Sequence, residues 1–249
     1  MRDTKGDIAL VTGASSGIGA AIVRRLTGAG REVVALARRA DRLAALAEET
    51  GCRTEALDVT DGERAEAFVR ELAPGVLVNN AGTGQGIDGL EGADAAAIRN
   101  ALLLNVEAPI RLTRAAVPPM RERGGGHVVN MGSIAGLYPI VSAVYGAGKG
   151  AVHLFSQNLR VELRGTGIRV TEIAPGRTTT EFYDAAVADE ATRARMTQTG
   201  ITELSPDDVA SAVLWAIEAP VHVNVGLIEL TPTEQALGGA HLVPVGGAN

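Results

Sequence analysis

The sequence predicts an α/β fold in which a doubly wound, parallel sheet of seven strands carries helices on both faces. Short runs of aliphatic residues alternate along the chain with longer amphipathic stretches, which is the pattern of βαβ units. The composition agrees, because 46% of the residues are hydrophobic but only 3% are aromatic. Small aliphatic side chains suit helices packed closely on a parallel sheet. Right-handed crossovers then place helices on both faces of the sheet.

In the first half of the chain, each expected strand is a short run rich in Val, Leu, Ile or Ala, and an amphipathic stretch follows it. Ile8–Thr12 leads through a glycine-rich turn into the helix Gly19–Thr27. The further strands expected here are Glu32–Ala37, Arg53–Leu57 and Val76–Asn79, and the helices between them are Asp41–Glu49 and Gly62–Leu72.

The second half continues the alternation, with one interruption. Strands are expected at His127–Met131, Ile168–Ile173 and Gly226–Leu230, and helices at Ile98–Arg121, Tyr145–Arg164 and Pro206–Glu218. Polar and small residues at Thr178–Gly200 interrupt the pattern beyond a strand's carboxyl end, where ligands bind in this architecture. We interpret residues 178–200 as a candidate lid. Since no repeat or linker divides the chain, residues 1–249 are expected to form a single domain.

Charge and composition exclude several function classes. The formal net charge is −6 and no Lys/Arg-rich run is present, so a nucleic-acid surface is not expected. No apolar stretch reaches the roughly 20 residues of a membrane span, and the apolar run near the N-terminus is too short for a signal peptide. Cys52 is the only cysteine and the four histidines lack ligand spacing, so neither a disulfide nor a metal is expected. A cytoplasmic location fits these features.

The turn after the first strand reads Thr12-Gly-Ala-Ser-Ser-Gly-Ile-Gly19 and opens a helix. Glycines here allow a tight turn, a close approach of the backbone to a pyrophosphate, and close packing of helix on strand. The free N–H groups and the dipole of the helix then face the phosphates. An ordinary glycine-rich turn is the alternative, but the place of the motif favours a dinucleotide site in a Rossmann-like fold. The predicted contacts are Gly13, Ser15, Ser16, Gly17, Ile18 and Gly19.

The end of the second strand indicates which dinucleotide is bound. An acidic residue there would bind the ribose hydroxyls and select NAD, but the strand ends at Ala37 and continues into Arg38 and Arg39. Guanidinium groups offer bidentate contacts to a 2′-phosphate, so NADP(H) is preferred over NAD(H). The alternative is that both arginines are solvated and pair with Asp41. Asp58, after the third strand, accepts a hydrogen bond from the adenine amino group or else caps the next helix.

Three residues after the fifth strand indicate proton transfer. Tyr145 and Lys149 are four residues apart and therefore lie on one helix face. A free tyrosine titrates near about 10, and a nearby ammonium lowers that pKa toward a useful range. In the reducing direction Tyr145 would donate a proton to a carbonyl oxygen that Ser133 also binds, while Lys149 reaches the nicotinamide ribose. A Tyr-x-x-x-Lys pair on an ordinary surface helix is the alternative.

Taken in order, these and further motifs resemble the short-chain dehydrogenase/reductase family over nearly the whole chain. The resemblance implies a catalytic tetrad, in which the asparagine helps to hold a water that relays protons to the lysine. The tetrad falls here on Asn105, Ser133, Tyr145 and Lys149. The cofactor-lining residues that the resemblance implies are Val59, Asn80, Ala81, Gly82, Tyr145, Lys149, Pro175, Gly176, Thr178 and Thr180, together with Asp58.

The tail of the chain is similar to one branch of that family. It lacks the frequent Asp-Gly-Gly ending and reads Val223-Asn-Val-Gly-Leu-Ile-Glu-Leu-Thr-Pro232. This resembles NADP-dependent 3-hydroxy acid (serine or allo-threonine) dehydrogenases and clavulanate-aldehyde-type reductases. Arg177 departs from the pattern, and it binds a substrate carboxylate or pairs with Glu181, four residues on. Further candidate pocket walls, with core packing as the alternative, are Tyr138, Ser142, Phe182 and Tyr183.

The predicted function is hydride transfer between NADPH and a small ketone, aldehyde or secondary alcohol, such as a 3-hydroxy acid or a secondary-metabolite carbonyl. A non-catalytic dinucleotide sensor or scaffold, and an epimerase acting through a transient ketone, are the alternatives. The helical segments Ala101–Pro118 and Gly150–Leu163 are apolar enough to join subunits. We therefore expect a homo-oligomer, either a tetramer or a dimer.

Overall fold

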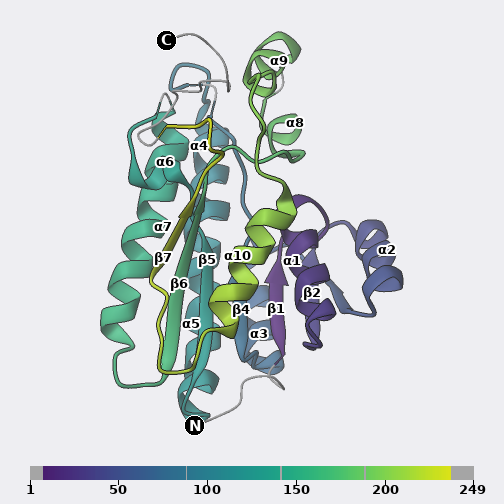
Figure 1. Cartoon of the computed structure of the whole chain (residues 1–249), viewed down its shortest axis with the longest axis vertical. Helices are drawn as coiled ribbons and strands as arrows, with labels where there is room; N and C mark the ends of the chain where they lie inside the picture. The colour runs from purple at the N-terminus through teal and green to yellow at the C-terminus, as the bar shows by residue number, and fades with distance from the viewer. Residues whose placement is uncertain (1–7, 88, 141, 188, 237–249) are drawn as a thin grey trace.

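The computed structural model describes residues 8–87, 89–140, 142–187 and 189–236, so both ends of the expected 1–249 domain lie outside the described range. Seven parallel strands form one sheet in the order β3-β2-β1-β4-β5-β6-β7 (Figure 1). The predicted fold class is thereby confirmed. The strands are β1 (Ala9–Thr12), β2 (Val33–Ala37), β3 (Arg53–Ala56), β4 (Val76–Asn79), β5 (Gly126–Met131), β6 (Ile168–Pro175) and β7 (Leu227–Leu230).

Helices connect the strands and cover both faces of the sheet. One face packs against α1 (Gly17–Gly28), α2 (Ala40–Thr50) and α10 (Pro206–Glu218). The other face packs against α3 (Gly62–Leu72), α5 (Ala108–Glu122) and α7 (Ala143–Glu162). The remaining helical elements are α4 (Ala95–Leu102), η1 (Leu103–Glu107), α6 (Ile134–Leu137), α8 (Phe182–Ala186) and α9 (Glu190–Thr197).

The central strands β1, β2 and β4 are almost wholly apolar, and both of their faces are buried. Successive side chains of a strand point to opposite faces, and in β1 Val11 packs toward α1 and α10 while Leu10 packs toward α3 and α5. Both are fully buried. This is why these central strands appear in the sequence as continuous runs of aliphatic residues rather than as alternating patterns.

The strand order places a crevice at the middle of the sheet. The chain begins at β1, moves outward through β2 and β3, and then returns to the other side of β1 as β4. Connections that leave β1 and β4 in opposite directions separate above the sheet, at the carboxyl ends of these two strands. In open α/β sheets this is where ligands bind.

The long helix expected at Ile98–Arg121 is interrupted. The chain forms α4, then five residues of π-helix at Leu103–Glu107, then α5. A π-turn widens the helix by one residue, and here it directs the buried Asn105 inward, where its side chain binds the backbone of Thr83. The helical pattern in the sequence shows no such interruption, because the bulge depends on a contact with a distant loop.

The candidate lid, residues 178–200, contains two short helices that stand beyond the carboxyl ends of the strands (Figure 1). Ala188 within it lies outside the described residues. α9 buries none of its residues, and α8 and α9 pack against each other. An isolated bridge between Thr178 and Leu204 joins the start of this segment to the residues before α10. Few buried contacts therefore hold α9.

The described residues contain neither a candidate membrane span nor a candidate metal site. None of their helices is both long and apolar enough to cross a membrane. No group of three or more His, Cys, Asp or Glu side chains among them is arranged to hold a metal ion.

Candidate active site

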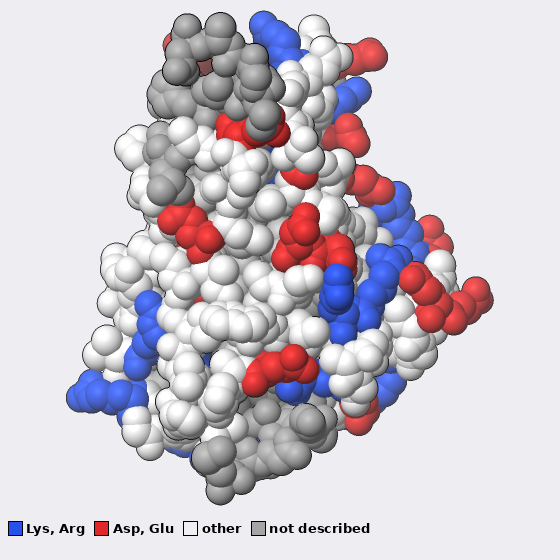
Figure 2. All heavy atoms as spheres, viewed as in Figure 1, with Lys and Arg blue, Asp and Glu red and all other residues white. Residues whose placement is uncertain are grey.

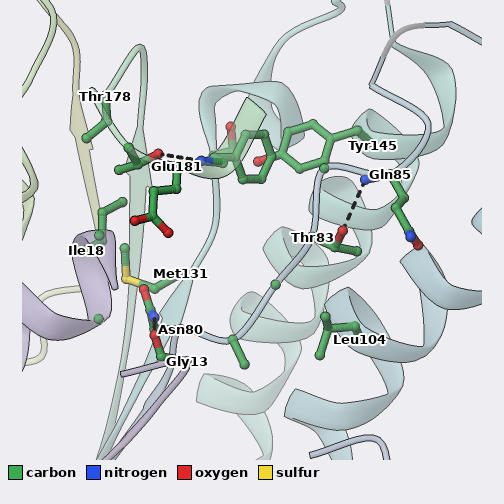
Figure 3. Close-up of a pocket in the computed structure, with 18 of the residues that line it drawn as sticks. Gly13, Ile18, Asn80, Thr83, Gln85, Leu104, Met131, Tyr145, Thr178 and Glu181 are labelled. Carbon is green, nitrogen blue, oxygen red and sulfur yellow. Dashed lines mark hydrogen bonds between the residues drawn. The ribbon is translucent and has the colours of Figure 1, made fainter. Parts of the chain in front are cut away.

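A cavity of about 790 Å³ opens at the carboxyl ends of the strands. Its walls come from the β1–α1 turn, the ends of β2 to β6, the helices α4 and α7, and the start of the candidate lid (Figure 3). Every predicted site residue lines it except Asn105 and Tyr138. Residues separated by more than a hundred positions in the chain thus share one space.

Close contact between two turns explains the glycines of the β1–α1 motif. Gly13 has a φ of +66°, which favours glycine, and a Cβ there would lie 2.8 Å from the Cα of Ala81. A Cβ on Gly19 would lie 2.3 Å from the carbonyl oxygen of Gly13. The Asn80 side chain donates to the Thr12 carbonyl oxygen at 2.9 Å, so the two turns are held together by hydrogen bonds as well as by packing.

The first turn of α1 suits an anion. Ser16 is the N-cap residue but its side chain makes no capping hydrogen bond, and the first turn contains no acidic residue. The N–H groups at a helix start have no partner within the helix and attract negative charge. This donor set, together with the close approach that Gly13 and Gly19 permit, fits the pyrophosphate of a dinucleotide.

The two arginines after β2 differ in their contacts. The Arg39 guanidinium donates to Ser16 Oγ at 2.6 Å and to Ser15 Oγ at 2.9 Å, and it lies 3.4 Å from Glu181. The Arg38 side chain is 72% exposed and lies 3.7 Å from Asp58. Neither pairs with Asp41, in contrast to the alternative considered above. Exposed ion pairs of this kind are weak, so a phosphate can replace them.

Asp58 does not cap a helix. Its Oδ1 accepts hydrogen bonds from the backbone N–H and the hydroxyl of Thr60, at 2.9 and 2.7 Å. The N-cap of α3 is Asp61. The capping alternative for Asp58 is therefore wrong, and the carboxylate remains at the cavity wall beside Val59.

Ser133, Tyr145 and Lys149 meet at one end of the cavity, and each is more than nine-tenths buried. Ser133 caps α6 by accepting from the N–H of Ala135 at 3.1 Å, and it hydrogen-bonds the phenol oxygen of Tyr145. Lys149 Nζ lies 5.8 Å from the centroid of the Tyr145 ring and donates to the Met131 carbonyl oxygen at 2.8 Å. The end of β5 thus holds both the serine and the ammonium.

Burial decides the charge states of these groups. It raises the pKa of Tyr145 well above the ordinary value, and the hydrogen bond to Ser133 works in the opposite direction. Burial lowers the pKa of Lys149 to about 8, while the charge of Glu172 raises it. The expected lowering of the Tyr145 pKa by the ammonium is not found, because burial dominates. The phenol is therefore protonated at neutral pH, as a proton donor must be.

Asn105 lies beside the cavity rather than in its wall. Its Oδ1 accepts from the Thr83 N–H and its Nδ2 donates to the Thr83 carbonyl oxygen, both at 2.8 Å. A Cβ on Gly82 would lie 3.0 Å from Asn105 Oδ1 and 3.8 Å from Lys149 Nζ. Asn105 is thus a near neighbour of Lys149, and both polar atoms of its amide bind the loop after β4.

The predicted pocket walls are divided between two places. Tyr138 donates from its hydroxyl to Glu229 Oε2 at 3.0 Å and does not line the cavity, so its assignment as a pocket wall is corrected. Ser142, Phe182 and Tyr183 do line the cavity. The Phe182 ring packs edge-on against the Tyr145 ring, with 5.6 Å between the centroids.

Arg177 faces the cavity and does not pair with Glu181. Its Nη1 donates to the Met196 carbonyl oxygen at 2.6 Å, and its guanidinium carbon lies 4.9 Å from the centroid of the Tyr183 ring. Glu181 instead binds Arg42 and Arg39. Among the described residues, no carboxylate forms an ion pair with Arg177. This guanidinium is held in place while keeping donors for another anion.

Other lining residues were absent from the sequence analysis. Gln235 Oε1 accepts from the N–H of Arg177 at 2.8 Å, and Thr83, Gln85 and Met196 also line the cavity. Figure 3 shows Thr83 and Gln85 on one loop, on the same side of the cavity as Tyr145. Gln85 follows the Asn79–Gly82 turn closely enough to have been a candidate, but Met196 and Gln235 belong to no motif.

Comparisons with known proteins show which proteins this chain is similar to. A family model described as short chain dehydrogenase matches residues 7–191. The NADP-dependent 3-hydroxy acid dehydrogenase of Salmonella typhi is 39% identical over 241 residues, which are 93% of this chain and 97% of that protein. Sulfoacetaldehyde reductase 2 of Chromohalobacter salexigens is 38% identical, with 92% and 96% covered. The closed form of a serine dehydrogenase complexed with NADP+ matches with a TM-score of 0.88 and 36% identity, covering 94% and 98%.

Proposed function

Because the chain belongs to the short-chain dehydrogenase family and is an NADP(H)-dependent oxidoreductase, we propose that it reduces a small anionic ketone or aldehyde, with Tyr145 as the proton donor. The reverse reaction oxidises the corresponding alcohol, including a 3-hydroxy acid. The observation that carries the proposal is a single cavity that holds a buried, protonated phenol and a guanidinium without a carboxylate partner among the described residues.

The residues that would hold the cofactor form the long wall of the cavity. The β1–α1 turn would bind the pyrophosphate, and Arg38 and Arg39 would bind the 2′-phosphate by charge-assisted hydrogen bonds. Asp58 and Val59 would line the adenine end, and Asn80, Ala81 and Gly82 the middle. The nicotinamide end would be lined by Pro175, Gly176, Thr178 and Thr180. Bound NADPH supplies a hydride to the carbonyl carbon of the substrate.

The protein's part of the reaction is proton transfer. As the carbonyl oxygen gains negative charge, the Tyr145 hydroxyl donates its proton to that oxygen, and Ser133 stabilises it by a hydrogen bond. Lys149 keeps further N–H donors beyond the one that binds Met131, and these are available to a ribose hydroxyl. Asn105 acts at a distance by holding the Thr83 loop beside Lys149.

Arg177 supports the choice of an anionic substrate. Its side chain lies in the same cavity as Tyr145, with the ring of Phe182 between the Tyr145 and Tyr183 rings. A guanidinium that stacks on an aromatic ring while keeping free N–H donors binds carboxylates and sulfonates well. Two of the relatives named above act on a 3-hydroxy acid and on sulfoacetaldehyde, and both compounds carry such a group.

Assembly and location complete the proposal. Apolar side chains are exposed on α4 and α5, at Leu102 and Ile110, and on α7, at Leu154 and Val161. They support a homo-oligomer, either a homotetramer or a dimer, whose subunits meet through these helices. The single cysteine is buried, which is consistent with a reducing cytoplasm.

Replacing Tyr145 by phenylalanine tests the proposal. The variant keeps the ring but loses the proton donor, so kcat should fall by roughly a hundredfold to ten-thousandfold, while NADPH affinity, followed by nicotinamide fluorescence, stays within a few-fold. Tyr138→Phe is the matched control, since Tyr138 lies outside the cavity, and it should turn over normally. Assays should include serine, sulfoacetaldehyde and uncharged ketones. Residual turnover of the Tyr145→Phe variant above a tenth of the wild-type value would refute the role of Tyr145. If the wild-type protein bound NADPH but turned over none of these compounds, the protein would be a sensor instead.

A further inference from the structure

A buried carboxylate lies behind the active site and has no part in the chemistry described so far. Glu172 is on β6, on the face that α7 covers, and is 1% exposed. Its Oε2 accepts from His153 Nδ1 at 2.7 Å. Its Oε1 is buried and has no hydrogen-bond partner among the described residues. Burying a carboxylate with one oxygen unpaired is costly, so a compensating interaction is expected.

The Lys149 ammonium is the group that can supply this interaction. Lys149 and His153 are one turn apart on α7 and therefore share a face. The Lys149 ammonium binds the carbonyl oxygen of Met131. The next residue, Gly132, touches the carboxylate so closely that a Cβ there would lie 2.2 Å from Glu172 Oε1. The ammonium and the carboxylate thus contact the same peptide unit, directly before Ser133.

We propose that Glu172, held in place by His153, is a positioning residue that acts as the buried counter-charge of Lys149 and keeps its ammonium charged in the active site. This inference rests on the proposed function, because it assigns Glu172 to the same ammonium. Opposite charges favour each other's ionised forms, and more strongly inside a protein than in water. Glu172 raises the pKa of Lys149, and Lys149 in turn lowers that of Glu172.

Few charged or titratable groups besides Lys149 surround Glu172. The groups that act on it are Lys149, His153 and Arg160, all from α7. Its in-register neighbours on β5 and β7 are the uncharged Asn130 and Leu227.

The remaining elements near β6 are engaged elsewhere. Glu229 on β7 binds the hydroxyl of Tyr138, which follows α6. α10 packs on the opposite face of β6, in the cluster that contains Ile173.

His153 connects this buried pair to solvent. Its side chain is 24% exposed, and its second ring nitrogen lies 2.8 Å from the exposed Gln157 amide. Burial raises the pKa of Glu172, and the hydrogen bond from His153 lowers it again. His153 therefore keeps the carboxylate ionised, and the charge on Lys149 depends on a residue at the surface of α7.

The pH profile of kcat tests the proposal. Lysine is charged below its pKa, so wild-type turnover should decline above about pH 8. Glu172→Gln keeps the shape of the side chain but removes its charge, so the alkaline decline should move toward lower pH by on the order of one pH unit. Glu229→Gln is the matched control on the neighbouring strand, and it should leave the alkaline limb unchanged. An unchanged limb in a folded Glu172→Gln enzyme would overturn the proposal.

His153→Leu provides a second test in case Glu172→Gln does not fold. Leucine suits this largely buried helix position and removes the donor that keeps Glu172 ionised. The alkaline decline should again move toward lower pH. If the limb of this variant stays at its wild-type pH while the protein is folded, the counter-charge role is wrong.

Thermal unfolding of the Lys149→Met, Glu172→Gln and double variants gives a readout that needs no activity. In the wild-type background Glu172→Gln leaves a buried ammonium unpaired and should lower Tm. In the Lys149→Met background it removes a buried carboxylate that has lost its counter-charge and should raise Tm. An equal effect in both backgrounds would refute the coupling. If Lys149→Met itself retained full turnover, the proposed function would fail instead, whatever the unfolding data show.

Discussion

At the scale of single residues, burial rather than proximity sets the chemistry of the active site. Tyr145 and Lys149 are both buried, and burial moves their pKa values in opposite directions, upward for the phenol and downward for the ammonium. Each shift favours the neutral form. A neutral phenol is the form that donates a proton, whereas a neutral amine would lose its attraction for the cofactor. Lysine therefore needs a counter-charge and tyrosine does not.

Arg38 should contribute to the choice of cofactor. Its exposed guanidinium has only a loose contact with Asp58. Arg38→Gln therefore removes a hydrogen-bond donor to the 2′-phosphate of NADPH without disturbing the fold. Losing one charge-assisted hydrogen bond should weaken NADPH binding by roughly tenfold to a hundredfold, with little effect on NADH. Arg42→Gln is the control, since Arg42 binds Glu181 but does not line the cavity. Titrations of both dinucleotides would measure this, and equal losses for the two would contradict it.

Arg177 should select anionic substrates. In Arg177→Gln, kcat/KM for serine or sulfoacetaldehyde should fall by roughly tenfold to a hundredfold because a charged hydrogen bond is lost. An uncharged ketone should be reduced as before. Arg195→Gln removes an exposed arginine of α9 that does not line the cavity and should change neither value. A parallel decline for charged and uncharged substrates would mean that Arg177 only supports the fold.

At the scale of elements, the contacts between helices hold the walls of the site in place. Glu66 on α3 is 4% exposed and accepts hydrogen bonds from Arg111 and Arg114 of α5 and from Arg70 one turn on. These bonds, led by the one from Arg111, lower the pKa of Glu66 to about 2. α5 continues directly from the π-turn that carries Asn105, so this cluster anchors the helix behind the tetrad.

The Glu66 cluster should make stability depend on acid. Because the pKa of Glu66 is lowered on folding, its contribution is present above the ordinary value of 4.5 and is lost as pH falls from there toward 2. Glu66→Gln removes the carboxylate that three partly exposed arginines share and should cost about 1 to 2 kcal/mol at neutral pH, measured by urea unfolding. The exposed Glu71→Gln on the same helix should change little. Equal unfolding free energies for wild type and Glu66→Gln at pH 7 would show that the cluster contributes nothing.

At the scale of the whole molecule, the helices on the two faces of the sheet differ in their exposed side chains. Figure 2 shows basic and acidic side chains interspersed on the side of α1 and α2, with no continuous basic field on this face. One ion pair on this side, between Arg24 and Glu49, joins α1 to α2. The exposed apolar residues of α5 and α7 belong to helices that cover the other face of the sheet. An association surface is therefore expected there.

The oligomer should depend on α7. Light scattering should give two or four times the 25.6 kDa of one chain. Leu154→Glu combined with Val161→Glu places two charges on the outer face of α7, where both residues are more than half exposed, and should dissociate the assembly because burying them is costly. Ala45→Glu, at an exposed position of α2, should not. A monomeric wild type, or an assembly that survives the double change, would contradict this interface.

Much of the fold and the site could be predicted because it depends on local patterns. The glycine turn from Thr12 to Gly19, the absence of an acidic residue at Ala37, and the spacing of Tyr145 and Lys149 are all visible in the sequence, and the structure gathers them in one cavity. The roles of the tetrad and the single domain stay predictions. Tyr138 was misplaced because the sequence near a motif does not show which way a tyrosine side chain points. A hydrogen bond to Glu229 on β7 holds the Tyr138 side chain outside the cavity.

The sequence by itself determined the order of strands and helices, the turn that suits a pyrophosphate, and the identity of the tyrosine, serine and lysine at the site. These follow from short stretches in which backbone geometry and side-chain spacing are local. Only the tertiary structure decided that Arg177 faces the cavity, that a π-turn directs Asn105 inward, and that Glu172 lies against Gly132, beside the carbonyl group that binds Lys149. The physical reason is that burial and charge pairing depend on segments far apart in the chain, and a single stretch of sequence carries no record of its neighbours.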